Sequence, residues 1–319
     1  MSEAIKRRRG TTAEHAAFTG LEGELTVDTS KKVVVVHDGV TPGGVPMARG
    51  DEVDELVTTT REKITANRTY YVRTDGNDAN SGLVDTATGA FLTFQRAIDV
   101  VSSLDFNGFT VTVKHGVESG TKTFTHNVKI GPLVGGGTLV VSGNGSGNTS
   151  FTSASGNTFT QELSGSTAVV YQRVTLNSAQ SGIKVNYLSL GVLGEDVVFG
   201  TFGENAVWVH DNQAVFQALN VEFAIIGSMQ SFLFIQYGHA FVEACTIVLV
   251  GAPAFSSAFY TAYPRGTLQY IGNTLSGAAT PNGKRFSISH QSICNLAGSG
   301  ENVLPGNAPG TADGTSIVI

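Results

Sequence analysis

The sequence predicts an all-β protein whose short strands stack into a parallel solenoid, closed at its start by one α-helix. Glycine accounts for 39 of 319 residues, as a fold with many turns requires. Runs rich in Val, Thr, Ser and Asn dominate after residue 105 and favour strands and turns. Apolar positions also recur every 24 to 26 residues, which indicates a repeat architecture.

Composition limits the class of protein. A hydrophobic content of 41% in 319 residues suffices for one large domain and a small one. The 20 basic and 26 acidic residues give a formal charge of -6, which argues against a nucleic-acid partner, because phosphate contacts need clustered Lys and Arg. The run from Lys6 to Arg9 is the exception, and we interpret it as a solvated polar edge.

Targeting signals and cysteines bear on the localisation of the protein and the state of its thiols. The N-terminus MSEAIKRRRG lacks the apolar core of a signal peptide, and the longest apolar run, near CTIVLVGAPAF, is too short to span a bilayer. We therefore expect a soluble protein with no membrane insertion. Cys245 and Cys294 fit no metal spacing and are expected to be free thiols made in a reducing compartment, with a disulfide as the alternative. No cofactor is expected.

Residues 5–50 carry a series of short polar motifs. In order these are Arg8, Arg9, Gly10 and Thr11; Ala13 and Glu14; Gly23 and Glu24; Asp28 and Thr29; and Asp38, Gly39 and Thr41. The pattern resembles the small N-terminal module of phage tail fibres and tropism determinants. The resemblance implies a virion-attachment module over residues 1–50, with Arg8, Arg9, Gly10, Thr11, Glu14, Glu24, Asp28, Asp38 and Gly39 as its site. The sequence departs from it at His15 and at Gly43-Gly44, where Trp is usual.

Inside this module, GELTVDTSKKVVVVHDG predicts two short strands joined by a turn at Asp28-Thr29-Ser30, with a second turn at Asp38-Gly39. A hairpin this small cannot bury its apolar face alone, so we expect it to need partners. The resemblance implies a homotrimer that docks on other virion proteins. Residues 51–68 place Val53, Leu56 and Val57 at helical spacing amid charges, which predicts a helical linker or coiled-coil stalk.

Residues 69–108 predict a cap made of a strand at Tyr70 to Arg73, a polar loop and a helix. Thr93 starts the helix, whose apolar face comprises Phe94, Ala97, Ile98 and Val101. This combination resembles the opening of right-handed parallel β-helices of the pectate-lyase-like and tailspike type, and implies such a β-helix over residues 69–290. The loop carries Asp75, Asn77, Asp78 and Asn80. These are calcium-ligand types but also ordinary turn residues without EF-hand spacing, so no metal is expected.

The repeat has four units aligned at Ser189, Gln213, His239 and Arg265, spaced 24, 26 and 26 residues apart, and a weaker unit near Thr167. Apolar residues at fixed offsets from these anchors are expected to point into the core. The expected inward columns are Ile183, Val207, Leu233 and Phe259; Val185, Val209, Ile235 and Thr261; and Val170, Val192, Phe216, Val242 and Leu268. Gln217, Glu243 and Gln269 are expected to point outward. Such units stack into a solenoid.

Aromatic residues fall between the inward positions. Trp208, Phe234 and Tyr260 share an expected outer column with Lys184; His210 lies in the next with Asn186, Gln236 and Ala262; and Tyr187, Asp211, Tyr237 and Tyr263 share a turn position. An exposed apolar stripe normally marks an interface. One interpretation buries the aromatic column between trimer subunits. Another makes it a carbohydrate platform, with hydrogen bonds from the polar residues, and a third covers it with a terminal segment.

Catalysis is not expected. A glycosidase needs two carboxylates about 5 to 9.5 Å apart, and no two of the repeat-region carboxylates fall in register. These are Glu195, Asp196, Glu204, Asp211, Glu222 and Glu243. Adjacent residues such as His210 and Asp211 cannot easily adopt triad geometry, and no serine lies in a nucleophile elbow. No catalytic residue is assigned, although a pair formed across subunits stays open.

The last segment, residues 291–319, is rich in Gly, Pro and Asn and is expected to cap the final turn or wrap onto a neighbouring subunit. It resembles the closing segment of phage β-helix proteins that share YYVRTDGNDANSG and FLTFQRAID. The leading hypothesis is a homotrimeric phage fibre of the virion that contacts host surface polysaccharide, or acts as scaffold, without cleaving it. The alternative is a tailspike depolymerase, a hydrolase or lyase, by fold-level analogy.

Overall fold

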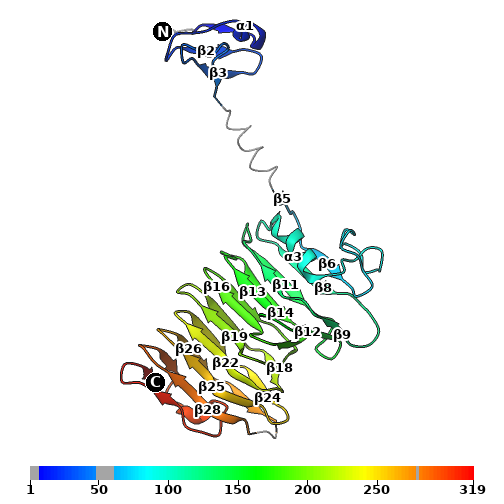
Figure 1. Ribbon diagram of the computed structural model, residues 1–319, viewed down its shortest axis with the longest axis vertical. Helices are drawn as coiled ribbons and strands as arrows, with labels where there is room; N and C mark the ends of the chain where they lie inside the picture. The colour runs from blue at the N-terminus through cyan, green and yellow to red at the C-terminus, as the bar shows by residue number, and fades with distance from the viewer. Residues whose placement is uncertain (1–6, 48–60, 278–279) are drawn as a thin grey trace. The chain divides into compact units, whose positions relative to one another are not determined.

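The computed structural model describes residues 7–47, 61–277 and 280–319. The chain divides into two compact units, Met1–Glu62 and Lys63–Ile319 (Figure 1). The first contains the predicted N-terminal module and the second the predicted solenoid. Most of the described residues in regular structure lie in strands, so the prediction of an all-β protein is confirmed.

The N-terminal module is one four-stranded sheet with a short helix. Its elements are β1 (Arg9–Gly10), α1 (Thr12–Ala16), β2 (Leu25–Asp28), β3 (Val33–Val36) and β4 (Val45–Pro46), and the strand order is β1-β2-β3-β4. The two predicted strands are β2 and β3, which pair antiparallel across the predicted turn. β1 joins β2 in parallel and β4 joins β3 antiparallel, so the hairpin gains a strand on each side.

The interior of the module is held by a chain of polar contacts. His15 and His37 are buried on either side of Thr26, with Nε2 of each ring 2.8 and 2.9 Å from Thr26 Oγ1. Gly20 N donates to His37 Nδ1, so His37 carries its proton on Nε2 and donates to Thr26. His15 Nδ1 faces the carbonyl of Thr11, so its Nε2 accepts from the Thr26 hydroxyl. Hydrogen bonds thus satisfy the histidine that stands where Trp is usual.

The predicted helical linker over residues 51–68 lies largely outside the described residues. The described part, residues 61–68, holds β5 (Glu62–Lys63) and the first residue of β6 (Arg68–Val72). β5 pairs with β7 (Leu104–Asp105) in a two-stranded sheet, and Ile64 is buried in the core of the second unit. Residues 63–68 therefore belong to the solenoid unit, and no part of residues 61–68 is helical.

The predicted cap is confirmed. Helix α3 (Phe94–Ser102) begins after Thr93, whose side chain accepts a hydrogen bond from Arg96 N, and it buries Phe94, Ala97, Ile98 and Val101. The Phe94 ring packs at 4.7 Å from Phe151 and 4.9 Å from Phe124. The helix lies at the beginning of the stack in Figure 1, where it covers apolar side chains that no earlier turn would cover.

The body is a three-sided parallel solenoid, because each strand pairs with strands one turn away in sequence. The eight-stranded sheet contains β10 (Val128–Ile130), β13 (Phe159–Glu162), β16 (Ile183–Asn186), β19 (Asn205–His210), β22 (Met229–Gln236), β25 (Ala254–Ala262), β28 (Asn282–Ile288) and β30 (Thr311–Ala312). The ten-stranded sheet contains β6, β8 (Thr110–His115), β11 (Thr138–Ser142), β14 (Ala168–Gln172), β17 (Leu190–Leu193), β20 (Val215–Leu219), β23 (His239–Glu243), β26 (Thr267–Ile271), β29 (Ile293–Asn295) and β31 (Ile317–Val318). The seven-stranded sheet contains β9 (Lys122–Phe124), β12 (Thr149–Ser153), β15 (Val174–Ser178), β18 (Val197–Phe202), β21 (Glu222–Ile225), β24 (Thr246–Leu249) and β27 (Thr274–Ser276).

Stacked aromatic rings fill the interior. Phe232 lies 5.4 Å from Phe223 and 5.1 Å from Phe259 in nearly parallel planes, and its edge meets Phe199 at 5.1 Å. All four rings are buried. Because successive turns stack along the axis, the Phe232 ring contacts rings of its own turn and of both neighbouring turns, and the core is continuous.

The predicted register holds for three turns and fails at β25. Ile183, Val207 and Leu233 are paired neighbours as predicted. However, β25 carries one extra residue where it pairs with β22, since Met229 and Ser231 face Phe255 and Ala258, which is a β-bulge. Leu233 therefore pairs with Tyr260 instead of Phe259. A constant spacing of 26 residues could not anticipate this insertion.

The register after the turn also differs from the prediction. Val192 pairs with Gln217 instead of Phe216, and Gln217 pairs with Phe241. Val170 and Val192 are only half-buried and face outward, so their assignment to the core is wrong. Gln217 and Gln269 do point outward, on either side of Phe241, while Glu243 lies in the adjacent column. Turns of unequal length cause these shifts: His239 is already the first residue of β23, whereas Ser189, Gln213 and Arg265 precede their strands.

The C-terminal segment continues the stack. β29 and β31 extend the ten-stranded sheet and β30 extends the eight-stranded one, while η1 (Glu301–Val303) leads to the buried Leu304. Cys245 and Cys294 are buried free thiols, as predicted. Burial raises the pKa of Cys294 to about 12, so this thiol stays protonated and packs as an apolar side chain.

The stacked rings predict a matched pair of stability effects. Phe232→Ala should lower the free energy of unfolding by about 3–5 kcal/mol, because it opens a cavity among fully packed rings. Phe234→Ala, two residues along the same strand, should cost much less, since that ring is half-buried on the outer face. Urea unfolding followed by circular dichroism measures both. Equal losses for the two variants would contradict the assigned register.

Candidate functional site

The outer face of the eight-stranded sheet carries the predicted Trp208 column. Lys184, Trp208 and Phe234 are paired neighbours on β16, β19 and β22, and all three are half-buried. Lys184 Nζ lies 3.7 Å from the Trp208 ring centroid, in cation–π geometry. Trp208 Nε1 donates to Gln236 Oε1 at 3.2 Å, and the Phe234 ring lies 6.0 Å away. The indole is therefore already engaged within the chain.

Burial lowers the pKa of Lys184, although the nearby charges of Glu162, Asp211 and Glu204 oppose this shift. An ammonium group stacked on Trp208 covers part of the ring that a sugar would otherwise contact. The ring surface that Trp208 exposes is therefore smaller than that of an unstacked tryptophan, because Lys184 packs against one part of it.

Tyr260 does not belong to this column. It is fully buried, and its hydroxyl donates to the carbonyls of Gly266 and Ile293 at 3.3 and 3.1 Å. Burial raises the pKa of its hydroxyl well above the usual value. Thr261 takes the outer position beside Phe234. The prediction that Tyr260 lies on a contact surface is therefore wrong, because the bulge in β25 turns it inward.

His210 and Asp211 form a local pair at the end of β19. His210 Nδ1 lies 3.0 Å from Asp211 Oδ2, and the imidazole edge meets the Trp208 ring at a centroid distance of 5.5 Å. His210 lies in the outer column as predicted, next to Asn186. The pair sits beside the turn, where His210 bridges to Tyr237 of the following turn. His210 and Asp211 thus form a partly exposed pair at the surface of the solenoid.

The most exposed aromatic side chains lie at the corner between the eight-stranded and ten-stranded sheets, here called the aromatic corner. Tyr187, Tyr237 and Tyr263 are 50%, 41% and 46% exposed there. The corner holds a groove of about 410 Å³ lined by Leu163, Tyr187, Leu188, Asp211, Asn212 and Gln213. Three turns later it holds a groove of about 480 Å³ lined by Tyr237, Pro264, Arg265, His290, Gln291 and Thr315. The tyrosines of the turn column that was predicted from the repeat are thus more exposed than the half-buried Trp208 and Phe234.

The carboxylates of the repeat region are mostly engaged in structural contacts. Glu195 pairs with Arg173 at 3.4 Å, Glu243 Oε1 accepts from Gln269 at 2.6 Å, and Asp196 accepts from Ser146. Glu204 Oε2 accepts from Ser181. Asp211 is the one carboxylate among the described residues that line the two corner grooves. Neither groove therefore contains the carboxylate pair that glycoside hydrolysis uses.

The polar loop before α3 is tied to its own backbone. Asp78 accepts from Leu92 N, Thr93 N and the Thr93 hydroxyl. Asn80 Nδ2 donates to two carbonyls of the loop, and Asp75 pairs with Arg73 at 2.8 Å. Over residues 7–47, 61–277 and 280–319, no group of three or more His, Cys, Asp or Glu is arranged to hold a metal. The side-chain oxygens of the loop therefore stabilise the loop itself and the start of α3.

One arrangement escaped sequence reasoning. His115 Nδ1 lies 2.6 Å from Thr149 Oγ1 and His115 Nε2 lies 2.9 Å from Glu118 Oε2, the order hydroxyl, imidazole, carboxylate of a catalytic triad. However, Thr149 and His115 are completely buried, and Thr149 Oγ1 also accepts from Asn144 N. No substrate could reach the hydroxyl. The hydrogen bonds among His115, Glu118 and Thr149, here called the clasp, instead hold the loop after β8 against the solenoid. Residues 34 positions apart give no sequence signal for it.

Most of the predicted attachment residues hold the module itself together. Thr11 and Glu14 form a capping box at α1, Asp28 accepts from Ser30 N, Lys31 N and Thr12 Oγ1, and Asp38 accepts from Val40 N and both polar groups of Thr41. These hydrogen bonds, first of all that from the Thr41 side chain, lower the pKa of Asp38 to about 2. Gly39 has a positive φ of 77° in this turn, which favours glycine. Arg8 pairs with Glu24 at 3.2 Å.

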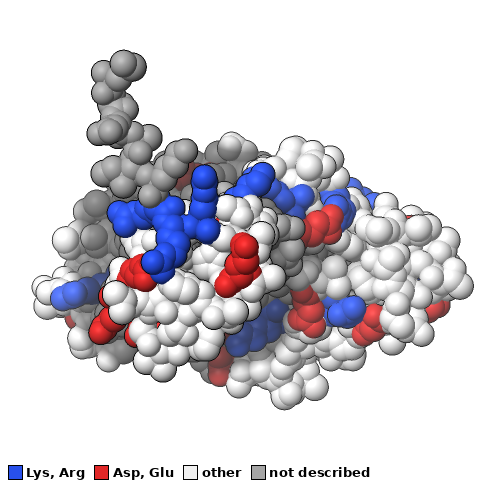
Figure 2. Space-filling view, turned by 90° about the horizontal axis from the view of Figure 1, so that it is seen from above, with Lys and Arg blue, Asp and Glu red and all other residues white. Residues whose placement is uncertain are grey.

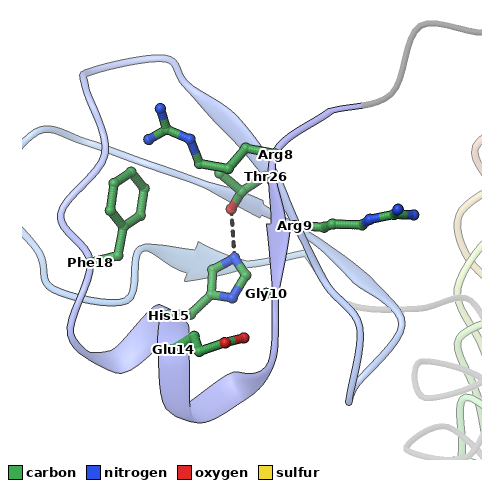
Figure 3. A pocket seen from close by; sticks show the side chains of 7 residues that line it. All are labelled: Arg8, Arg9, Gly10, Glu14, His15, Phe18 and Thr26. Atoms are coloured by element: carbon green, nitrogen blue, oxygen red, sulfur yellow. Dashed lines mark hydrogen bonds between the residues drawn. The ribbon is translucent and has the colours of Figure 1, made fainter.

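A pocket of about 260 Å³ opens on the module beside β1 (Figure 3). It is lined by Arg8, Arg9, Gly10, Glu14, His15, Phe18 and Thr26. The Arg8 guanidinium lies over the Phe18 ring at 4.8 Å, and Figure 3 shows Arg9 pointing away from Phe18. Arg8, Arg9 and Glu14 are exposed. These three predicted attachment residues lie at the surface of the module, although Arg8 also pairs with Glu24 and Glu14 also caps α1.

Charge is sparse on the molecule. Figure 2 shows one face on which uncharged residues predominate and blue and red side chains are scattered among them, in line with a charged fraction of 14%. No helix within the described parts of the chain is long and apolar enough to cross a membrane.

Fold and module together describe a β-solenoid joined to the kind of N-terminal module that phage tropism determinants carry. Residues 5–41 match the family model described as Major tropism determinant N-terminal domain. The chain is 44% identical over 96 residues to the Tail fiber receptor-binding protein of Bordetella phage BPP-1, which is 30% of this chain and 24% of that protein. The chain therefore matches about a quarter of the length of this curated relative.

Solved structures give a similar result. The U1 and I1 variants of the Major Tropism Determinant are each 61% identical to this chain over 15% of its length and 13% of theirs, with TM-scores of 0.15. A structure described as Geobacillus virus E2 - ORF18 aligns over 98% of this chain and 74% of its own, at 13% identity and a TM-score of 0.29. The family-model match lies in the N-terminal part, as the resemblance predicted, and the second unit of this chain is a β-solenoid.

The buried clasp predicts that stability falls in acid. Burial lowers the pKa of His115, and hydrogen bonds from Thr74 and His115 outweigh the opposite effect of burial on Glu118, so that its pKa is also lowered. Both groups bind protons more tightly when unfolded, so their contribution is present at neutral pH and is lost as pH falls below about 6.5. Thermal melts between pH 7.5 and 4.5 should show this loss.

A matched pair of variants separates the clasp from general acid effects. His115→Gln should cost about 1–3 kcal/mol at pH 7.5, because Glu118 loses its buried donor, and should flatten the dependence on pH. His126→Gln, at a half-buried position on the loop after β9, should leave both unchanged. A pH dependence that is the same in His115→Gln and the unaltered chain would contradict the assignment.

Proposed function

We propose that this chain is a receptor-binding fibre component of a phage virion. The N-terminal module joins it to other virion proteins, and the aromatic corner contacts host surface polysaccharide without cleaving it. The observation that carries the proposal is the 44% identity over 96 residues with a protein named as a tail fibre receptor-binding protein. The exposed Arg8, Arg9 and Glu14 around the module pocket support a role in attachment.

Polysaccharide suits the shape and chemistry of the aromatic corner. Tyr187, Tyr237 and Tyr263 recur along the solenoid axis at the spacing of its turns, about 4.8 Å per strand. Aromatic rings offer flat apolar faces with a polar tip, which match sugar rings and their hydroxyls. His210, Asp211 and Gln236 lie beside them at the ends of β19 and β22. A repeating surface favours a repeating ligand.

Absence of cleavage is supported by the groove composition. Asp211 is the single carboxylate of the described groove linings, whereas hydrolysis of a glycosidic bond uses two. Depolymerisation is therefore the less supported alternative. It would require a second carboxylate from another copy of the chain.

Self-association into a homotrimer is supported by the outer face of the ten-stranded sheet. Its half-buried outward residues include Val140, Val170, Leu190, Val192, Val215, Phe241 and Ile293. Ten strands spaced about 4.8 Å apart, with about five residues of about 3.3 Å each, present a face of about 700 Å². This approaches the roughly 800 Å² per partner of a stable interface. This face, more than the Trp208 column, has the composition of a subunit contact.

Binding to envelope polysaccharide of a susceptible host tests the function. The double variant Tyr187→Ala with Tyr237→Ala should lose about tenfold or more in affinity, since each aromatic contact contributes on the order of 1 kcal/mol. Isothermal titration measures the affinity, and an assay for new reducing ends and unsaturated uronates follows the same mixtures. Unchanged affinity would overturn the polysaccharide role, and released fragments would establish the depolymerase instead.

Mass in solution tests the assembly. The full chain should sediment as a trimer at micromolar concentration. Phe241→Arg should weaken the assembly, because it places a charge in the centre of the apolar face, whereas Phe234→Arg on the eight-stranded sheet should not. Analytical ultracentrifugation distinguishes them, with circular dichroism to confirm that both variants fold. A monomeric parent chain would overturn the homotrimer.

A further inference from the structure

The two grooves of the aromatic corner lie on turns of unusual composition. The turns that lead out of the eight-stranded sheet place bulky residues at positive φ, namely Leu163, Tyr187, Leu188, Asp211, Tyr237, Arg265, His290 and Gln291. The turns that lead from the ten-stranded to the seven-stranded sheet use Arg173, Asp196, Asn220, Ala244, Gly272 and Ala297. Left-handed backbone suits Gly, Asn and Asp and disfavours bulky side chains. The solenoid uses left-handed backbone at both corners. Bulky residues, for which this conformation costs more free energy, take it mainly at the aromatic corner.

The geometry points to a ligand that these side chains contact. Strained positions that persist against their cost are typical of functional sites. The groove of about 480 Å³ is the more distinctive of the two, because its lining combines an aromatic ring, a proline, a cation, an amide and a hydroxyl. Its volume falls in the range of pockets that hold small ligands.

Backbone contacts between successive turns fix this groove. Tyr237 N donates to Pro264 O at 2.8 Å, Arg265 N to His290 O at 3.0 Å, and Gln291 N to Thr315 Oγ1 at 3.2 Å. On the last turn, Asp313 accepts from His290 N at 2.8 Å and from Thr315. The four turns that supply the lining are therefore tied in register, and the side chains face a ligand as a preformed set.

Arg265 is the charged group of the groove. Its Nε donates to Gln291 Oε1 at 3.2 Å, which orients the guanidinium and leaves its two terminal nitrogens for another acceptor. Arg265 is exposed, and within the described ranges no acidic side chain forms an ion pair with it. The described lining contains no Asp or Glu. A planar guanidinium with two free nitrogens matches a carboxylate in bidentate geometry.

We propose that this groove binds a carboxylate-bearing sugar, so that the host polysaccharide is acidic. Arg265 takes the sugar carboxylate, Tyr237 packs against the ring, and Gln291 and Thr315 contact hydroxyls. The neighbouring groove, with Asp211 and no cation, takes an uncharged sugar of the same chain. The inference rests on the proposed polysaccharide-binding function and specifies the class of ligand.

The test compares acidic polysaccharides with neutral counterparts of the same backbone. The full chain is titrated with polygalacturonate, with polysialic acid and with envelope polysaccharide of a susceptible host, each before and after chemical reduction of its carboxyl groups. The acidic host polymer should bind, and carboxyl reduction should weaken it by about tenfold or more, as expected for a charge-assisted pair. Binding should also weaken as salt rises from 0.05 to 0.5 M, concentrations chosen to screen the pair.

Two matched arginine variants test whether Arg265 is the residue that binds the sugar carboxylate. Arg265→Gln should lose about tenfold or more for the acidic host polymer and little for its reduced form. Arg173→Gln, at positive φ on the other corner and paired with Glu195, should bind both like the parent chain. Thermal melts confirm that both variants fold.

The outcomes distinguish failure of the acidic-sugar assignment from failure of the proposed polysaccharide binding. Equal binding of the native and reduced host polymers, or an equal effect of the two arginine variants, overturns the acidic-sugar assignment and leaves polysaccharide binding intact. No binding to any polymer, native or reduced, overturns the polysaccharide function itself. Selective loss in Arg265→Gln supports both.

Discussion

The parallel backbone ladder between successive turns is the constraint on which the rest of the structure depends. Strands of the body pair with strands one turn away, so that after the first turn residues 22 to 31 positions apart become neighbours. Since side chains alternate along a strand, the ladder sends Val207 and Val209 into the core and Trp208 and His210 outward. The stacked rings around Phe232 and the apolar face of α3 are consequences, because an interior that repeats along an axis must be filled in every turn and closed at its end.

The same ladder decides what the surface can do. Three sheets require corners, and at two of the three corners the turns carry residues in left-handed backbone. Where Asn220, Ala244 and Gly272 take that conformation, the turn is a connection. Where Tyr237, Arg265 and His290 take it, side chains with specific chemistry are held at a fixed spacing along the axis. The solenoid thus converts a sequence repeat into a row of side chains along its axis, which is the feature that the proposed polysaccharide contact uses.

The three faces of the solenoid differ in character. The outer face of the ten-stranded sheet mixes apolar residues such as Val170, Val192 and Phe241 with Gln217 and Gln269. The eight-stranded sheet presents Lys184, Trp208, His210 and Gln236, which contact one another. A face whose polar groups are mutually satisfied has less to gain from a subunit contact than an apolar one. The aromatic corner lies between these two faces, so a subunit contact on one side and a ligand at the corner are compatible.

The sequence by itself determined the classes of element and several of their details. Helix α3 with its Thr93 cap and the β2–β3 hairpin follow from local signals, namely apolar spacing, a capping residue and turn residues. The inward places of Val207 and Leu233 follow from alternation. Only the tertiary structure decided that Tyr260 is buried, that Val192 faces outward and that His115, Glu118 and Thr149 meet. The extra residue in β25 reverses the predicted direction of the side chains that follow it in that strand, and a turn of another length shifts the pairing of the next strand. No local pattern reveals which residues distant in the chain will lie in neighbouring turns.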